Sequence, residues 1–275
     1  MSLRWLITGC SRGLGRALAQ AVLEAGHHLV ATARNPQDLA GLAAHHGDRL
    51  RLAALDVTDP ALATAAADLA MEAFGGLDVL VNNAGYGNIN AVEDTTFEDF
   101  RAQIEANLIG TVIMTKAVIP LMRKQGSGHI IQFSSVGGRI GAPGRSAYSA
   151  AKWGVEGFSE VLAREMALIG VKVTIVEPGG FRTEFAGKSS VIVEGRAEYD
   201  AVVGAAARMQ RDYHGRQPGD PARAAKALLA LAALPCPPLR LPLGSDALDA
   251  IAKAAQQTLA DLEAWRELSA STDFP

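Results

Sequence analysis

The hydrophobic positions alternate along the chain between short apolar runs and longer segments with apolar residues three and four positions apart. A continuous apolar run is typical of a strand buried on both faces, and the longer spacing is typical of a helix with one buried side. The apolar runs occupy residues 5–8, 28–32, 50–55, 77–81, 129–133, 171–176 and 239–243. Helical segments that begin near residues 14, 36, 60, 95, 146 and 221 separate them.

Residues at the expected helix starts support these boundaries. Three of the helices begin with a capping side chain followed by proline, at Asn35-Pro36, Asp59-Pro60 and Asp220-Pro221. Thr95 and Glu98 have the spacing of a capping box, which predicts the start of the helix that runs toward Arg123.

The regular alternation of strands and helices predicts an α/β chain. Right-handed βαβ units give a parallel sheet with helices on both faces, so we predict a single-domain, doubly wound Rossmann fold with a seven-stranded, mostly parallel sheet. Pro242 lies in the seventh strand and places it at an edge. The catalytic domain is predicted to span residues 1–244, with a substrate lid at 181–219. Residues 245–275 have helical periodicity and are predicted to pack on the same domain.

Composition excludes several other classes of protein. Among 275 residues, 26 Lys and Arg against 29 Asp and Glu give a net charge of −3, without the basic excess of a nucleic-acid-binding protein. The apolar stretch 227–238 is about 12 residues long, too short to span a membrane. Two cysteines, and no His and Cys cluster with metal-ligand spacing, predict a cytoplasmic protein without a metal.

A glycine-rich loop follows the first predicted strand. Gly9, Gly13 and Gly15 have the spacing Gly-x-x-x-Gly-x-Gly, and a helix follows immediately. Backbone N–H groups and the helix dipole can bind a phosphate there, provided that no Cβ blocks the approach. On the motif alone, a tight strand-to-helix turn remains an alternative.

Tyr148 and Lys152 form the sharpest candidate for catalysis. Their spacing of four places both side chains on one face of a helix, one turn apart. A tyrosine with a pKa of about 10 is a poor base near neutrality, and a close ammonium can lower that pKa toward about 7. A second positive group nearby would act in the same direction.

Together with three later motifs, the loop and the Tyr-x-x-x-Lys pair resemble the short-chain dehydrogenase/reductase family. These motifs are Asp56-Val57, Asn82-Asn83-Ala84-Gly85, and Pro178-Gly179 with Thr183, after the third, fourth and sixth strands. The resemblance covers residues 3–244. The cofactor contacts that it implies are Gly9, Ser11, Arg12, Gly13, Leu14, Gly15, Arg34, Asp56, Val57, Asn83, Ala84, Gly85, Tyr148, Lys152, Pro178, Gly179 and Thr183.

The resemblance also implies two further catalytic residues. Ser135 stands thirteen positions before Tyr148, which is similar to the family's spacing, and its hydroxyl would bond the substrate oxygen. Asn107 lies inside the helix that runs toward Arg123. The resemblance implies a local helix distortion there and a water-linked proton path to Lys152.

The end of the second strand predicts the choice of cofactor. An NAD site usually has an acid there, which holds the ribose 2′-hydroxyl. This chain has Arg34 instead, and Arg12 in the glycine loop adds a second cation for a 2′-phosphate. We therefore predict NADP(H) rather than NAD(H).

The predicted function is interconversion of a small carbonyl compound and an alcohol by hydride transfer, with Tyr148 as general acid or base. Two alternatives stay open: an NAD-dependent alcohol or hydroxysteroid dehydrogenase, and a dinucleotide-binding regulatory protein without turnover. The resemblance implies a homodimer or homotetramer, and we expect neither a nucleic-acid nor a membrane partner. Arg139, Arg145 and Arg182 could anchor an acidic substrate group or be ordinary exposed arginines, and the mostly apolar surroundings favour a mid-sized hydrophobic substrate.

Overall fold

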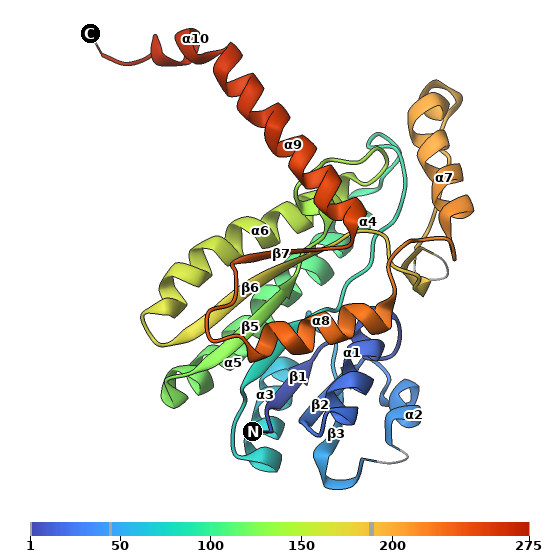
Figure 1. Ribbon diagram of the computed structural model, residues 1–275. Coiled ribbons are helices and arrows are strands. Elements are labelled where there is room, and N and C mark those ends of the chain that lie inside the picture. Colours follow the sequence, from blue (N-terminus) through green and yellow to red (C-terminus); the bar gives the residue numbers. More distant parts are fainter. Residues whose placement is uncertain (1, 44–45, 187–189, 275) are drawn as a thin grey trace.

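The computed structural model describes residues 2–43, 46–186 and 190–274 and contains one seven-stranded sheet (Figure 1). The strands are β1 (Arg4–Ile7), β2 (His28–Ala33), β3 (Leu50–Ala54), β4 (Val79–Asn82), β5 (Gly128–Phe133), β6 (Val171–Pro178) and β7 (Arg240–Leu243). Their order in the sheet is β3-β2-β1-β4-β5-β6-β7, and all neighbouring strands are parallel. The predicted doubly wound Rossmann fold is therefore confirmed, with Pro242 in an edge strand.

Helices cover both faces of this sheet. They are α1 (Gly13–Glu24), α2 (Ala40–Ala43), α3 (Pro60–Phe74), α4 (Phe97–Ile104), α5 (Gly110–Gln125), α6 (Ser146–Ala167), α7 (Ala205–Tyr213), α8 (Pro221–Ala233), α9 (Ser245–Ala264) and α10 (Arg266–Ala270). Helices α1 and α8 pack together on one face, and α3, α5 and α6 pack on the other. The strand order reverses between β1 and β4, which is where doubly wound sheets bind ligands.

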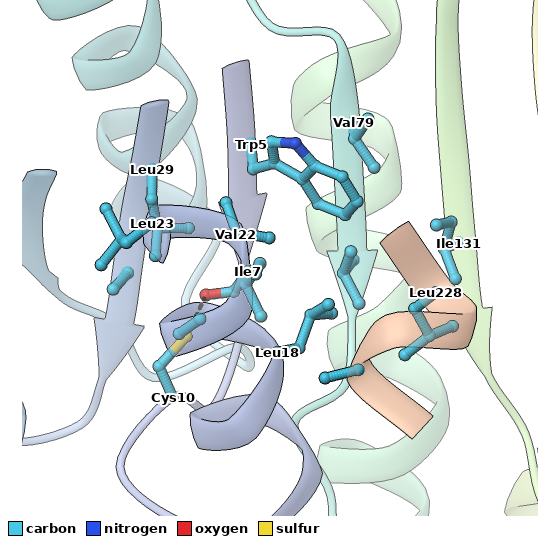
Figure 2. Packing of buried hydrophobic residues seen from close by; sticks show 14 of the residues in the cluster. Trp5, Ile7, Cys10, Leu18, Val22, Leu23, Leu29, Val79, Ile131 and Leu228 are labelled. Carbon is cyan, nitrogen blue, oxygen red and sulfur yellow. Dashed lines mark hydrogen bonds between the residues drawn. The ribbon is translucent and has the colours of Figure 1, made fainter. Parts of the chain in front are cut away.

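The core on the α1 side includes a cysteine of the glycine loop. Figure 2 shows Trp5, Leu18 and Leu228 packed in one cluster, with Cys10 at its lower end. The Cys10 thiol is fully buried and donates to the carbonyl of Ile7 at 3.2 Å. Burial raises the pKa of this thiol to about 12, so Cys10 is a neutral packing residue.

The continuous helix formed by α4, a π-helical segment (Glu105–Ile109) and α5 is long enough to cross a membrane, and an 18-residue stretch of it has a mean hydropathy of 1.4. Its Met114, Val118 and Met122 side chains are nevertheless buried against the sheet. This packing is the arrangement of a core helix in a Rossmann fold.

Helix starts agree with the sequence except at one position. Asp59 and Asp220 accept hydrogen bonds from the first-turn N–H groups of α3 and α8, as predicted. The predicted cap at Thr95 is wrong, because α4 begins one residue later. Thr96 accepts from the N–H of Asp99 at 3.1 Å, while the Thr95 hydroxyl donates to Ala91 O.

The predicted packing of residues 245–275 on the domain is wrong for most of their length. Ala247 is buried, and Asp246 Oδ2 accepts from Gly180 N–H at 2.7 Å, so the first turn of α9 is anchored. From residue 255 to residue 274 every residue is exposed, and Figure 1 shows α9 projecting away from the rest of the molecule. Beyond Ala254, the described part of this chain offers no surface for the apolar side of α9.

Candidate active site

The carboxyl ends of six strands, β1 to β6, open into one cleft of about 980 Å³. Except for Gly15, every residue predicted to act in catalysis or cofactor binding lines this cleft. These residues are far apart in sequence, from Gly9 to Thr183. They meet in the cleft because the strands are parallel and their carboxyl ends lie at the same edge of the sheet. Gly15 lies behind the loop and is buried.

The glycine loop is held close to the end of β4. Gly9 and Gly13 have φ angles of +72° and +62°, in the left-handed region that favours glycine. A Cβ on Gly15 would lie 2.3 Å from Gly9 O and 2.4 Å from Asn83 Nδ2. The Asn83 amide donates to the carbonyls of Thr8 and Gly9, at 2.8 and 3.1 Å. Gly15 therefore acts by allowing this close approach rather than by contacting a ligand.

The start of α1 fits the phosphates of a dinucleotide. Arg12 at its N-cap makes no capping side-chain hydrogen bond, and the first turn carries no acidic residue. The first N–H groups of a helix have no partner within that helix, and their positive end favours an anion. The loop and helix start thus have the form of a phosphate site, and the same cleft continues to Asp56 and Arg34.

Charged groups stand at the adenosine end of the cleft. Arg12 and Arg34 are exposed there, and no acid follows β2 directly. Asp56 Oδ1 accepts from the N–H and hydroxyl of Thr58, at 3.0 and 2.7 Å. These bonds lower the pKa of Asp56, so the carboxylate stays ionised.

Tyr148 is buried in the first turn of α6, between two glycines. A Cβ on Gly87 would lie 2.7 Å from the ring Cδ2, and one on Gly137 would lie 3.2 Å from Cε1. Sequence reasoning left Gly137 without a role and missed Gly87, which stands in no predicted motif. Both glycines create the slot that holds the ring.

Ser135 lies beside this ring. Its Oγ accepts from Gly137 N–H at 3.0 Å, which leaves the hydroxyl proton free for another acceptor. The neighbouring Ser134 side chain is buried. Burial raises the pKa of Tyr148 above its ordinary value, and the Ser135 hydroxyl and the Arg145 cation oppose that rise. Lys152 is not among the groups that lower this pKa, so the part of the predicted lowering that was assigned to its ammonium is not found.

Lys152 lies one helical turn beyond Tyr148 and is buried. Its Nζ donates to Phe133 O at 2.7 Å and stands 5.7 Å from the Tyr148 ring centroid. Burial lowers the pKa of Lys152 to about 8, opposed by the nearby Glu156. The ammonium is tied to a backbone carbonyl rather than to the phenol.

Asn107 lies in the π-helical segment, so the local helix distortion is confirmed. Its Nδ2 donates to Tyr86 O and Gln103 O, each at 2.8 Å, and its Oδ1 accepts from Tyr86 N–H at 3.2 Å. A Cβ on Gly85 would lie 2.5 Å from Asn107 Oδ1 and 3.6 Å from Lys152 Nζ. Asn107 and Lys152 thus flank the same glycine.

The segment after β6 forms the remaining wall. Its residues that line the cleft are Gly179, Gly180, Phe181, Thr183, Phe185, Gln210, Tyr213 and Gln217. The Phe185 and Tyr148 ring centroids are 5.7 Å apart. Gln210 and Gln217 lie within the predicted substrate lid, residues 181–219, but no sequence motif singled them out.

This fold and cleft define a Rossmann-type, dinucleotide-binding oxidoreductase. The family model of short chain dehydrogenases matches residues 4–191. Oxidoreductase BOA17 of Botryotinia fuckeliana is 50% identical over 266 residues, which cover 96% of this chain and 97% of that protein. A short-chain dehydrogenase from Streptomyces avermitilis has a TM-score of 0.91 at 40% identity over 100% of both chains. The structure of ElxO with bound NADP has a TM-score of 0.75 at 27% identity, over 90% of this chain and 100% of that one.

The chain therefore belongs to the short-chain dehydrogenase/reductase family. As a member it is an oxidoreductase whose cofactor is a nicotinamide dinucleotide.

Proposed function

We propose that the protein interconverts a carbonyl compound and an alcohol with NADP(H). The observation that carries this proposal is the convergence of Ser135, Tyr148 and Lys152 on the cleft that begins at the glycine loop. A dinucleotide-binding protein without turnover would not need this combination of side chains.

The roles follow from the chemistry of each group. The reduced cofactor, when bound, supplies a hydride to the carbonyl carbon. Tyr148, whose raised pKa keeps the phenol protonated, gives its proton to the carbonyl oxygen. The free hydroxyl proton of Ser135 bonds the same oxygen. Lys152 would hold the nicotinamide ribose, and Asn107, on the other side of Gly85, would position the water through which protons reach Lys152.

The test is the Tyr148→Phe variant, which removes the proton donor and keeps the ring. Turnover of an accepted ketone or aldehyde should fall about 10²- to 10⁴-fold, while binding of NADPH, followed by its fluorescence, stays unchanged. Tyr199→Phe is the matched control, because its exposed hydroxyl bonds Glu93 outside the cleft. Wild-type turnover by Tyr148→Phe would refute the mechanism.

The preference for NADP(H) is supported by Arg12 and Arg34 at the adenosine end of the cleft and by the NADP bound to ElxO. Arg34→Ala should weaken NADPH binding about 10- to 100-fold through loss of a charge-assisted contact, with little effect on NADH. Arg164→Ala, an exposed arginine outside the cleft, is the control. Tighter wild-type binding of NADH than of NADPH would favour the NAD-dependent alternative.

A homodimer or homotetramer in the cytoplasm completes the proposal. Phe97 on α4 and Trp153 and Val161 on α6 are exposed apolar side chains, with 77%, 54% and 58% of their surface accessible, as expected of an interface. Cys10 and Cys236 are both free thiols, which suits a reducing compartment. Sedimentation as a monomer at micromolar concentration would contradict the oligomer.

A further inference from the structure

The three arginines that could serve an acidic substrate have different surroundings in the fold. Arg139 Nη1 donates to the buried carboxylate of Glu177 at 2.8 Å. Arg182 Nε donates to Gln217 O at 2.7 Å, and neither arginine lines the cleft. Arg145 lines the cleft, and no residue in the described part of the chain accepts a hydrogen bond from its guanidinium or pairs with it.

The backbone holds Arg145 in a fixed position at the start of α6. Its N–H donates to Ala142 O at 3.1 Å, and its carbonyl accepts from Ser149 N–H at 2.8 Å. The guanidinium carbon stands 6.0 Å from the Tyr148 ring centroid. The cation is therefore beside the phenol that would receive the substrate oxygen.

A half-buried guanidinium without a counter-ion is energetically costly. Burial lowers the pKa of Arg145, because the charged guanidinium has lost part of its hydration. The neighbouring Tyr148 acts in the opposite direction but only partly offsets this lowering. An ionised group that lies in a cleft and has no partner in the described protein is a candidate for ligand binding. The planar fork of arginine matches a carboxylate, which can accept two parallel hydrogen bonds.

The other cations of the cleft do not compete for this role. Arg12 and Arg34 lie at the adenosine end, and Lys152 is bonded to Phe133 O. The lining also includes Ile140 and Ala142, which shortly precede Arg145 in the chain, and Phe185, whose ring lies beside Tyr148. Among the described residues, one unpaired cation next to these apolar side chains suits an amphipathic molecule with one negative charge.

We infer that Arg145 forms a carboxylate-binding subsite and that the preferred substrates are keto acids or acidic aldehydes with an apolar spacer. The carboxylate binds the guanidinium while the carbonyl oxygen faces Tyr148 and Ser135. Because this orientation places a reacting carbonyl at Tyr148, the subsite rests on the proposed function.

Matched acid and ester substrates test the subsite. The substrates are 4-carboxybenzaldehyde and methyl 4-formylbenzoate, and 4-oxopentanoate and its methyl ester, each with NADPH. The wild type should prefer the acid by about 10- to 100-fold in kcat/KM, the range expected for charge-assisted hydrogen bonds. Arg145→Met should remove this preference, because KM should rise about 10- to 100-fold more for the acid than for the ester. Arg145→Lys should keep part of it.

Arg216→Met is the control, because Arg216 is exposed and does not line the cleft. Equal use of acid and ester by the wild type would overturn the subsite. The subsite would also be overturned if Arg145→Met lost kcat equally on the acid and on the ester and its pH profile shifted. That result would mean that Arg145 acts only through Tyr148.

Binding of benzoate, which cannot be reduced in this way, separates the subsite from the proposed function. If the wild type reduces none of these aldehydes and ketones but binds benzoate at least tenfold more tightly than Arg145→Met does, the function fails and the subsite stands. Equal affinities for benzoate in the two proteins would overturn the subsite whatever the activity.

Discussion

At the scale of single residues, one imidazole in the sheet links stability to pH. His129 on β5 is 4% exposed, and its Nε2 lies 3.0 Å from Thr174 Oγ1. Burial lowers the pKa of His129 to about 4, and the nearby Lys172 acts in the same direction. The folded protein therefore excludes a proton that the unfolded chain binds below a pH of about 6.5.

This difference sets the direction of a pH effect. As the pH falls from about 6.5 toward 4, the unfolded state takes up the proton first, so His129 costs stability progressively, up to about 3 kcal/mol. His129→Asn should remove that contribution, and urea unfolding at several pH values measures it. The exposed His214→Asn is the control. Parallel pH dependence in wild type and His129→Asn would contradict this prediction.

Residues with fixed spacing could be predicted from the sequence, and residues that act through space could not. The separations of Ser135, Tyr148 and Lys152 placed them correctly in one cleft. Gly87 matters only because the Tyr148 ring lies against it, and Arg145 stands out only because Arg139 and Arg182 have partners. Those facts depend on the folded arrangement.

At the scale of elements, polar side chains in and after the π-helical segment donate to backbone carbonyls four residues earlier. Asn107 Nδ2 donates to Gln103 O, and the Thr111 hydroxyl donates to Asn107 O at 3.0 Å. The Thr115 hydroxyl continues the pattern to Thr111 O at 2.7 Å. The distortion is therefore built into the sequence by polar residues at intervals of four.

Asn107→Ala should destabilise the fold by about 2–3 kcal/mol. The substitution leaves the carbonyls of Tyr86 and Gln103 without their amide donor, and an unsatisfied buried polar group costs about 1–3 kcal/mol. Thr111→Val, which removes a single bond, should cost about 1 kcal/mol. Urea unfolding measures both. An Asn107→Ala protein as stable as the wild type would show that the side chain does not support the segment.

Element boundaries depend on choices that the sequence leaves open. Thr95 and Thr96 each precede an acidic residue by three positions, at Glu98 and Asp99. The Thr95 hydroxyl donates to Ala91 O, so this side chain does not cap the helix. Thr96 is the N-cap of α4 instead. A capping pattern locates a helix start to within a residue, and tertiary contacts decide the rest.

At the scale of the whole molecule, the α/β alternation predicted the fold but not the position of the tail. Periodicity shows that a helix has an apolar side. It does not show whether the same chain provides a surface to cover that side. Leu259, Leu262 and Trp265 form part of that side of the tail and are 67%, 64% and 63% exposed.

A shortened chain that ends at Ala254 tests how much the tail contributes. Residues 255–274 are exposed and no cleft residue lies beyond Gln217, so the unfolding free energy should change by less than about 0.5 kcal/mol and kcat/KM should not change. Asp246→Ala is the contrasting variant, because it removes the acceptor of Gly180 N–H beside Gly179 and should lower both quantities. Thermal melts and NADPH oxidation are measured at several protein concentrations. A concentration-dependent loss of stability in the shortened chain would mean that another molecule covers the tail in solution.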